Sequence, residues 1–187
     1  MDGSAASTKR RRGPSILPEL SSLNSDVSPV GMAAGDPLPD TNHGHQTARV
    51  AIRVLLDKQL GFHEPSRQER DALLVGFAMQ RRALHGASFD LVRLSRPVNL
   101  SDPADIARSM DAITIYEIKS TNRKSLKPDL KGYFFNITAA ELLVAQALGA
   151  QFRFAFVNTL TGHYEEMSVT EIFGRSKAIY PAYHIRF

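Results

Sequence analysis

The stretch Ile113-Thr-Ile-Tyr-Glu-Ile-Lys-Ser-Thr121 is rich in β-branched and apolar residues and carries a carboxylate and an ammonium two residues apart. In a β-strand, residues two apart project to the same face of the sheet, so Glu117 and Lys119 share a face with Ile113 and Ile115. Both faces are largely apolar over the first half of the stretch, which predicts an interior strand. Charges at the end of an interior strand cost folding free energy unless they find partners, and a divalent cation and a phosphate would serve.

Glu117-Ile118-Lys119 resembles the E-x-K half of the PD-(D/E)xK nuclease motif. The other half should be an Asp at the start of the preceding strand. The predicted strand Ser88-Phe-Asp-Leu-Val-Arg-Leu94 offers Asp90, which lies 27 residues before Glu117 (117 minus 90). A helix opening within 135–141 and a strand at 152–157 follow. This order over residues 66–160 resembles the core of the superfamily, which includes restriction and repair nucleases, and especially its NO VEIN-type, restriction-endonuclease-like branch.

Asp111 is the main rival to Asp90 for the role of the first carboxylate. It lies only 6 residues before Glu117 (117 minus 111). On one extended strand this spacing separates the two side chains by about 20 Å at ~3.3 Å per residue. A single cation cannot bridge that gap, so Asp90 is favoured.

The resemblance implies an α/β fold with a restriction-endonuclease-like core, in which helices flank a central mixed sheet of about four to five strands. It also implies Mg²⁺, with Mn²⁺ as a substitute, held by Asp90, Glu117 and the backbone carbonyl of Ile118. Lys119 would orient the attacking water and offset charge in the transition state. Accessory residues would come from the neighbouring helices.

The accessory candidates are Glu69 on the helix before the motif and Gln146 or Glu141 on the helix after it. Ser66-Arg-Gln-Glu69 also matches a capping box, which gives Glu69 an equally good structural role. Thr138-Ala-Ala-Glu141 is a second capping box, and for Glu141 the cap is the simpler interpretation.

A basic segment follows the motif. Residues 119–131 hold five basic residues and one acidic residue, a balance of +4, equal to the net charge of the whole chain. The predicted nucleic-acid-binding residues are Arg123, Lys124, Lys127 and Lys131. Beside a metal site, this is the footprint expected for a phosphate backbone, and the alternative is a solvated loop.

The chain has 187 residues, a pI of about 9.5 and no cysteine, which predicts one domain without disulfides. Residues 1–46 are rich in Ser, Gly and Pro and are expected to be disordered or loosely packed, whereas 47–187 would form the nuclease-like domain. No apolar run approaches ~18 residues, so no membrane association is expected. We expect a cytoplasmic protein, or a nuclear one in a eukaryote, where the basic cluster at 9–12 could act as an address.

Further elements are predicted from periodicity and caps. The predicted helices span 47–60, with Thr47 as N-cap, then 66–84 and 142–148, with a helical turn at 105–110. A short strand is predicted at 133–137 and another at 164–169. The three phenylalanines of the strand at 152–157 are expected in the core.

Two functions from different classes are compatible with these features. The first is an Mg²⁺-dependent endodeoxyribonuclease of the restriction or repair type, for which a homodimer would supply the two sites needed to cut both strands. RNA is not excluded as the substrate. The second is a non-catalytic nucleic-acid-binding or adaptor protein that keeps the fold without turnover.

Overall fold

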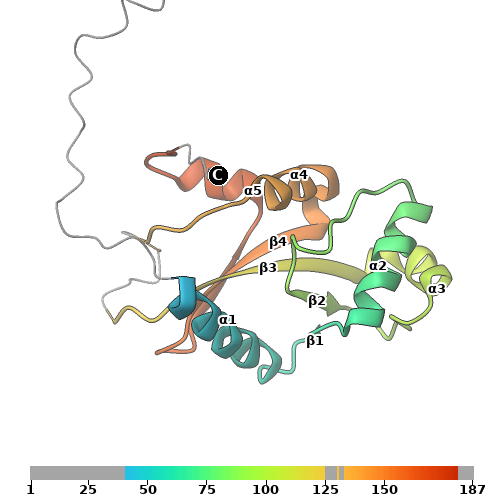
Figure 1. The fold of residues 1–187 in the computed structure, drawn as a ribbon, viewed down its shortest axis with the longest axis horizontal. Coiled ribbons are helices and arrows are strands. Elements are labelled where there is room, and N and C mark those ends of the chain that lie inside the picture. Colours follow the sequence, from blue (N-terminus) through green and yellow to red (C-terminus); the bar gives the residue numbers. More distant parts are fainter. Residues whose placement is uncertain (1–40, 125–129, 131–132, 181–187) are drawn as a thin grey trace, which may run out of the picture. The chain divides into compact units, whose positions relative to one another are not determined.

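A five-stranded mixed sheet flanked by helices forms the centre of the protein in the computed structural model (Figure 1). The structure describes residues 41–124, 130 and 133–180, with side chains from Thr47 onward. In chain order the elements are α1 (Thr41–Leu56), β1 (Phe62–His63), α2 (Arg67–Met79), β2 (Leu91–Leu94), α3 (Pro103–Arg108), a 3₁₀ turn (Met110–Ala112), β3 (Ile113–Thr121), α4 (Ala139–Leu148), a second 3₁₀ turn (Gly149–Gln151), β4 (Phe152–Asn158), β5 (Tyr164–Met167) and α5 (Val169–Arg175). The expected α/β class is therefore confirmed.

The strands lie in the order β1-β2-β3-β4-β5, with β3 in the middle of the sheet. β3 pairs antiparallel with β2 and parallel with β4, and the other two pairings are antiparallel. A parallel pair needs a crossover connection, which α4 supplies between β3 and β4. The central position of β3 explains why its sequence is apolar on both faces.

The two faces of the sheet are covered by different helices (Figure 1). On one face, Tyr116 and Ile118 of β3 pack with Ala51 and Leu55 of α1. On the other face, the apolar side chains of β3 and β4 pack against α2, α3, α4 and α5. The phenylalanines of β4, Phe152, Phe154 and Phe156, are almost fully buried on this second face, as predicted.

Three helices begin with a capping box, in which a Ser or Thr side chain and a Glu three residues later each accept a backbone N–H. The boxes at Ser66/Glu69 and Thr138/Glu141 confirm the sequence prediction. A third box, Ser168/Glu171, begins α5. These boxes satisfy main-chain N–H groups in the first turn of α2, α4 and α5.

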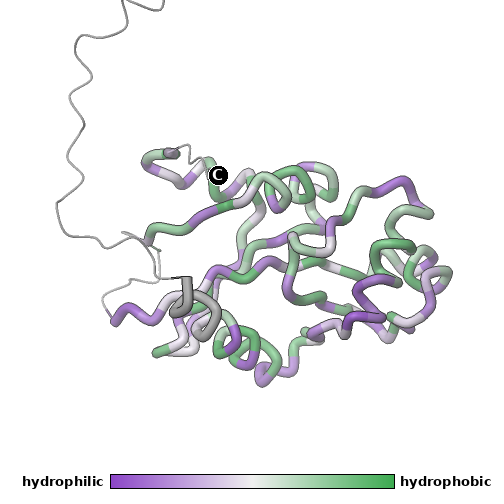
Figure 2. The backbone as a smooth tube through the Cα atoms, in the orientation of Figure 1, coloured by the Kyte–Doolittle hydropathy of each residue, from purple (hydrophilic) through white to green (hydrophobic). Residues whose placement is uncertain are grey.

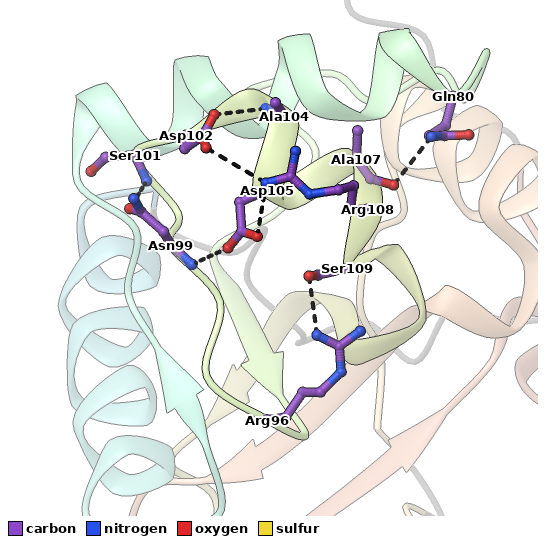
Figure 3. Close-up of polar contacts among 10 residues, drawn as sticks. All are labelled: Gln80, Arg96, Asn99, Ser101, Asp102, Ala104, Asp105, Ala107, Arg108 and Ser109. Atoms are coloured by element: carbon purple, nitrogen blue, oxygen red, sulfur yellow. Dashed lines mark hydrogen bonds and ion pairs between the residues drawn. The ribbon is translucent and has the colours of Figure 1, made fainter.

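The connection between β2 and β3 contains α3 and is held together by hydrogen bonds among its own residues (Figure 3). Asp102 caps α3 through the amide of Ala104 at 2.9 Å, and the amide of Asn99 donates to Asp105 at 2.8 Å. Gln80, just after α2, donates to the carbonyl of Ala107 at 3.2 Å. The predicted turn at 105–110 is therefore a packed part of the fold.

The strand predicted at 133–137 is wrong, because residues 133–138 have no regular secondary structure. β2 and β4 already occupy both edges of β3, so this segment finds no strand partner there. The alternation that suggested a strand serves aromatic packing instead. The rings of Tyr133 and Phe135 stack at 5.6 Å, and both lie edge-on to Phe156.

Several helix boundaries also differ from the prediction. α1 begins at Thr41, within the segment expected to lack order, so Thr47 lies inside the helix, and its hydroxyl bonds to Ser120 Oγ at 3.0 Å. Leu60, predicted on the apolar stripe, is exposed beyond the helix end. α2 ends at Met79 rather than near Leu84, although Leu84 still packs against the core.

None of the helices among the residues described has the length and apolar character needed to cross a membrane.

Candidate active site

The charged side chains of β3, Glu117 and Lys119, project from the sheet face that α4 covers. In the parallel register Glu117 pairs with Phe154, and Lys119 pairs with Phe156. Both phenylalanines are buried, so they place apolar surface beside the two charged groups. The side chains of Glu117 and Lys119 are only 12% and 11% exposed. The sequence-predicted E-x-K pair is therefore brought together in a largely desolvated position.

Asp90 lies immediately before β2, opposite this end of β3. Its amide donates to the carbonyl of Tyr116 at 2.8 Å, and its Oδ2 accepts the amide of Ile118 at 2.9 Å. Pairing between β2 and β3 stops at Leu91 and Tyr116, so Ile118 has no main-chain partner from β2. The carboxylate of Asp90 takes that place and is thereby held against the E-x-K segment.

Arg70 of α2 fixes the chain just before Asp90. Its Nη1 donates to the carbonyls of Gly86 and Phe89 at 2.9 and 2.6 Å. Its guanidinium also lies over the Phe89 ring, 4.3 Å from the ring centroid. The position of Asp90 therefore depends on α2 as well as on β3, and this role of Arg70 was not predicted.

Glu141, the capping residue of α4, completes the cluster. Lys119 Nζ donates to Glu141 Oε2 at 2.7 Å and to Glu117 Oε1 at 3.0 Å. The side chain of Glu141 is only 6% exposed, so this ion pair is more deeply buried than an ordinary surface pair. The sequence showed the cap, but nothing in the local pattern showed that the same carboxylate would contact Lys119.

The cluster holds more negative than positive charge, and this affects its titration. Burial, followed by the charge of Asp90, raises the pKa of Glu117 to about 8, although Lys119 acts in the opposite direction. Burial also raises the pKa of Asp90, against the lowering effect of its hydrogen bond from Ile118. A positive charge placed between these two carboxylates would relieve both effects.

The oxygen donors available to a cation are the carboxylates of Asp90 and Glu117 and the carbonyl of Ile118. Residues in a ladder direct N–H and C=O to the same neighbour, so the Ile118 carbonyl faces the side where Asp90 accepts its amide. Within the described ranges, no group of three or more His, Cys, Asp or Glu side chains is placed to hold a metal ion. This donor set fits Mg²⁺, which commonly takes one or two carboxylates and keeps several waters.

Of the accessory candidates, Glu141 belongs to this cluster, whereas Glu69 and Gln146 do not. Glu69 Oε2 accepts the amide of Ser66 at 2.8 Å and contacts His63 Nε2 at 3.1 Å. Those two contacts lower the pKa of Glu69, the Ser66 amide most strongly. Gln146 is exposed on α4. It comes five positions after Glu141, which places it on another face of the helix.

Asp111 lies at the opposite end of β3 from Glu117. Its Oδ1 accepts from Arg96 Nη2 at 2.7 Å, and its side chain is 76% exposed. The choice of Asp90 over Asp111 therefore agrees with the geometry.

The basic segment begins directly after β3, where the chain becomes hydrophilic (Figure 2). Arg123 and Lys124 are exposed. The loop that carries them is tied to β4, because the Asn158 side chain donates to the carbonyl of Arg123 at 3.2 Å. Lys127 and Lys131 lie outside the described residues.

Comparisons with known proteins found no matching family model, no matching curated protein and no matching solved structure.

Proposed function

We propose that this protein is a metal-dependent nuclease that hydrolyses phosphodiester bonds in DNA. The observation that carries the proposal is the meeting of Asp90, Glu117 and Lys119 at the end of two neighbouring strands, in a buried position with excess negative charge. The order α2-β2-β3-α4-β4 supports it, because it is similar to the restriction-endonuclease-like core. That finer fold assignment is part of the proposal.

Each residue has a defined role in this proposal. Asp90, Glu117 and the Ile118 carbonyl would hold Mg²⁺, or Mn²⁺ in its place. A bound cation lowers the pKa of a water ligand and polarises the phosphate. Lys119 orients the attacking water and offsets the negative charge that develops on the phosphate oxygens. An ammonium has three N–H donors, and the two carboxylate contacts leave one for water or phosphate.

The substrate would approach from the side of the basic segment. Arg123 and Lys124 follow Lys119 within five residues and are exposed, so they can contact a phosphate backbone without leaving the loop. They carry no evident sequence specificity, because phosphate contacts position a nucleic acid without reading its bases.

A cleavage assay tests the proposal. Supercoiled plasmid, single-stranded DNA and RNA are incubated with protein in Mg²⁺, Mn²⁺ or EDTA, and the wild type is compared with Asp90→Ala and Lys119→Ala. Asp111→Ala is the matched control, because it removes an exposed aspartate at the other end of β3. We expect metal-dependent cutting that is lost in the first two variants and kept in the third.

Cutting that survives in Asp90→Ala and Lys119→Ala would refute the assigned site. A wild type that binds DNA but never cuts it would favour the alternative, a non-catalytic nucleic-acid-binding or adaptor protein. In that case Lys119 and its two carboxylates would act as a structural ion-pair network.

A further inference from the structure

Lys119 is held by two carboxylates that come from different elements. Glu117 lies two residues away on the same strand, whereas Glu141 reaches it from the first turn of α4. The contact to Glu141, at 2.7 Å, is the shorter of the two. The ammonium is thus fixed by a helix as well as by its own strand.

The carboxylate of Glu141 is itself held in place by the main-chain amide of Thr138, which does not depend on the Thr138 side chain. Its Oε2 accepts the amide of Thr138 at 3.2 Å, and its own amide donates to the Thr138 hydroxyl at 3.2 Å. The same oxygen receives Lys119, so the cap and the ion pair share one atom. The Glu141 carboxylate therefore lies at the N-terminus of α4, where a partial positive charge attracts it.

The two carboxylates would not be equivalent once a cation binds. Glu117 is a proposed metal ligand, so a cation would compete with Lys119 for its oxygens and repel the ammonium. Glu141 is not among the proposed ligands and can keep its contact. Without Glu141, the ammonium would have no fixed counter-charge beside an occupied metal site.

We infer that Glu141 is the positioning residue that keeps the Lys119 ammonium directed at the reacting phosphate when Glu117 is occupied by metal. This inference rests on the proposed nuclease function. It predicts that Glu141 affects the rate of the chemical step and leaves substrate binding nearly unchanged, because the groups that contact the nucleic acid stay in place.

The kinetic test compares Glu141→Gln with two controls. Glu171→Gln makes the same substitution in the capping box of α5, whose Glu contacts Arg153 instead of Lys119. Thr138→Ala weakens the cap of α4 but leaves the Glu141 carboxylate present. We expect kcat of Glu141→Gln to fall about 10- to 100-fold, with KM within about threefold of the wild type. Both controls should keep kcat within about threefold of the wild type.

A change of kcat in Glu141→Gln that Thr138→Ala reproduces would overturn the inference, because the effect would then come from the helix cap. A change confined to KM would overturn it as well. Equal kcat values for Glu141→Gln and Glu171→Gln would also overturn the inference.

A second readout does not depend on cleavage. The side-chain ammonium of Lys119 can be followed by ¹⁵N NMR, where slow hydrogen exchange reveals an ammonium held by hydrogen bonds, and Lys119→Arg assigns the signal. The spectra are recorded in excess Mg²⁺, under which Glu117 would be engaged by the cation. We expect a protected signal in the wild type and in Glu171→Gln, and its loss in Glu141→Gln.

The two readouts separate the inference from the proposed function. The Lys119 signal could be protected in a Glu141-dependent way in a protein that cuts no substrate. That result would contradict the nuclease proposal but would support the positioning of Lys119 by Glu141. Absence of a protected signal in the wild type would overturn the inference even if Glu141→Gln did not fold. Persistence of the signal in folded Glu141→Gln would do the same.

Discussion

Two polar networks begin at neighbouring residues of β3 and lie on opposite faces of the sheet. On the α1 face, the Tyr116 hydroxyl donates to Glu166 Oε2 at 2.7 Å, and Arg93 donates to Glu166 Oε1 at 2.7 Å. On the α4 face, Glu117 and Glu141 share Lys119. The first network pairs one carboxylate with one guanidinium. In the second, Asp90 lies nearby, so three carboxylates are opposed by the Lys119 ammonium and by the Arg70 guanidinium.

This difference in charge balance separates a network that supports the fold from one suited to binding. A buried carboxylate costs free energy unless a positive charge and hydrogen bonds compensate it. Glu166 has both, so its network is complete as it stands. Glu117 shares its cation with Glu141 and is also repelled by Asp90, so a further positive charge would be favourable there.

The largest expected effect is on cleavage. Glu117→Gln removes a proposed metal ligand with almost no change in shape, so the cleavage rate in Mg²⁺ should fall by about 10²- to 10³-fold. Glu166→Gln makes the same change in the balanced network on the other face and should leave the rate within a few-fold. Plasmid cleavage by both purified variants measures the difference.

Glu166→Gln, which should spare cleavage, should instead lower the stability of the fold. Glu166→Gln leaves Arg93 without its ion-pair partner, and a cost of about 1–3 kcal/mol in the free energy of unfolding is expected for a partly exposed pair. Similar losses of cleavage in the two variants, or a loss that tracks stability, would contradict the distinction between the two networks.

The next effect concerns the pH dependence of stability in EDTA. The pKa of Glu117 is about 8 in the folded protein, above its ordinary value of 4.5. The group therefore stabilises the folded state fully below pH 4.5, and this contribution is lost as the pH rises through 8. Glu117→Gln imitates the protonated acid, so the variant should be more stable than the wild type above pH 8 by about 1–3 kcal/mol and should match it near pH 5.

Urea unfolding at pH 5, 7 and 9 in EDTA measures this effect. Lys119 keeps its contact with Glu141 in the variant, so the substitution does not leave the ammonium unpaired. A wild type that is more stable than Glu117→Gln at pH 9 in EDTA would show that the Glu117–Lys119 pair outweighs the repulsion from Asp90.

A smaller effect is expected for Tyr116→Phe on the balanced face. The substitution removes one hydrogen bond to Glu166 but leaves Arg93 in place, so the free energy of unfolding should fall by about 1 kcal/mol. Burial and the contact with Glu166 raise the pKa of Tyr116, so this contribution is present throughout the neutral range. Urea unfolding at pH 7 measures this loss. A change in the cleavage rate beyond a few-fold would show that the Glu166 network and the Glu117–Lys119 cluster are energetically coupled.

Periodicity and caps predicted much of what surrounds the site. β3 was recognised because an interior strand is apolar on both faces, and α4 because Thr138 and Glu141 form a capping box. These signals are local and do not depend on tertiary contacts. The strand predicted at 133–137 failed because an alternating pattern does not show whether a neighbouring strand has a free edge.

The composition of the site was only partly predictable for the same reason. Asp90 was predicted because the resembled motif expects an Asp at the start of the strand before Glu117, and the structure places Asp90 against Ile118. The contact of Glu141 with Lys119 joins residues 22 positions apart on a strand and a helix, and no local pattern encodes it. Arg70 acts through main-chain carbonyls, which carry no sequence signature.

The smallest expected effect concerns the exposed residues after β3, where Arg123→Gln and Lys124→Gln should weaken DNA binding by a few-fold each. Because each removes one phosphate contact, the slope of log K against log salt should fall by about 1 per substitution, equally for all DNA sequences. Arg67→Gln, at an exposed position on α2, is the control and should leave the slope unchanged. Binding is measured by fluorescence anisotropy in Ca²⁺ at several salt concentrations. An unchanged slope for Arg123→Gln and Lys124→Gln would show that the segment after β3 does not contact the backbone and that the substrate approaches the excess negative charge of the α4 face from another side.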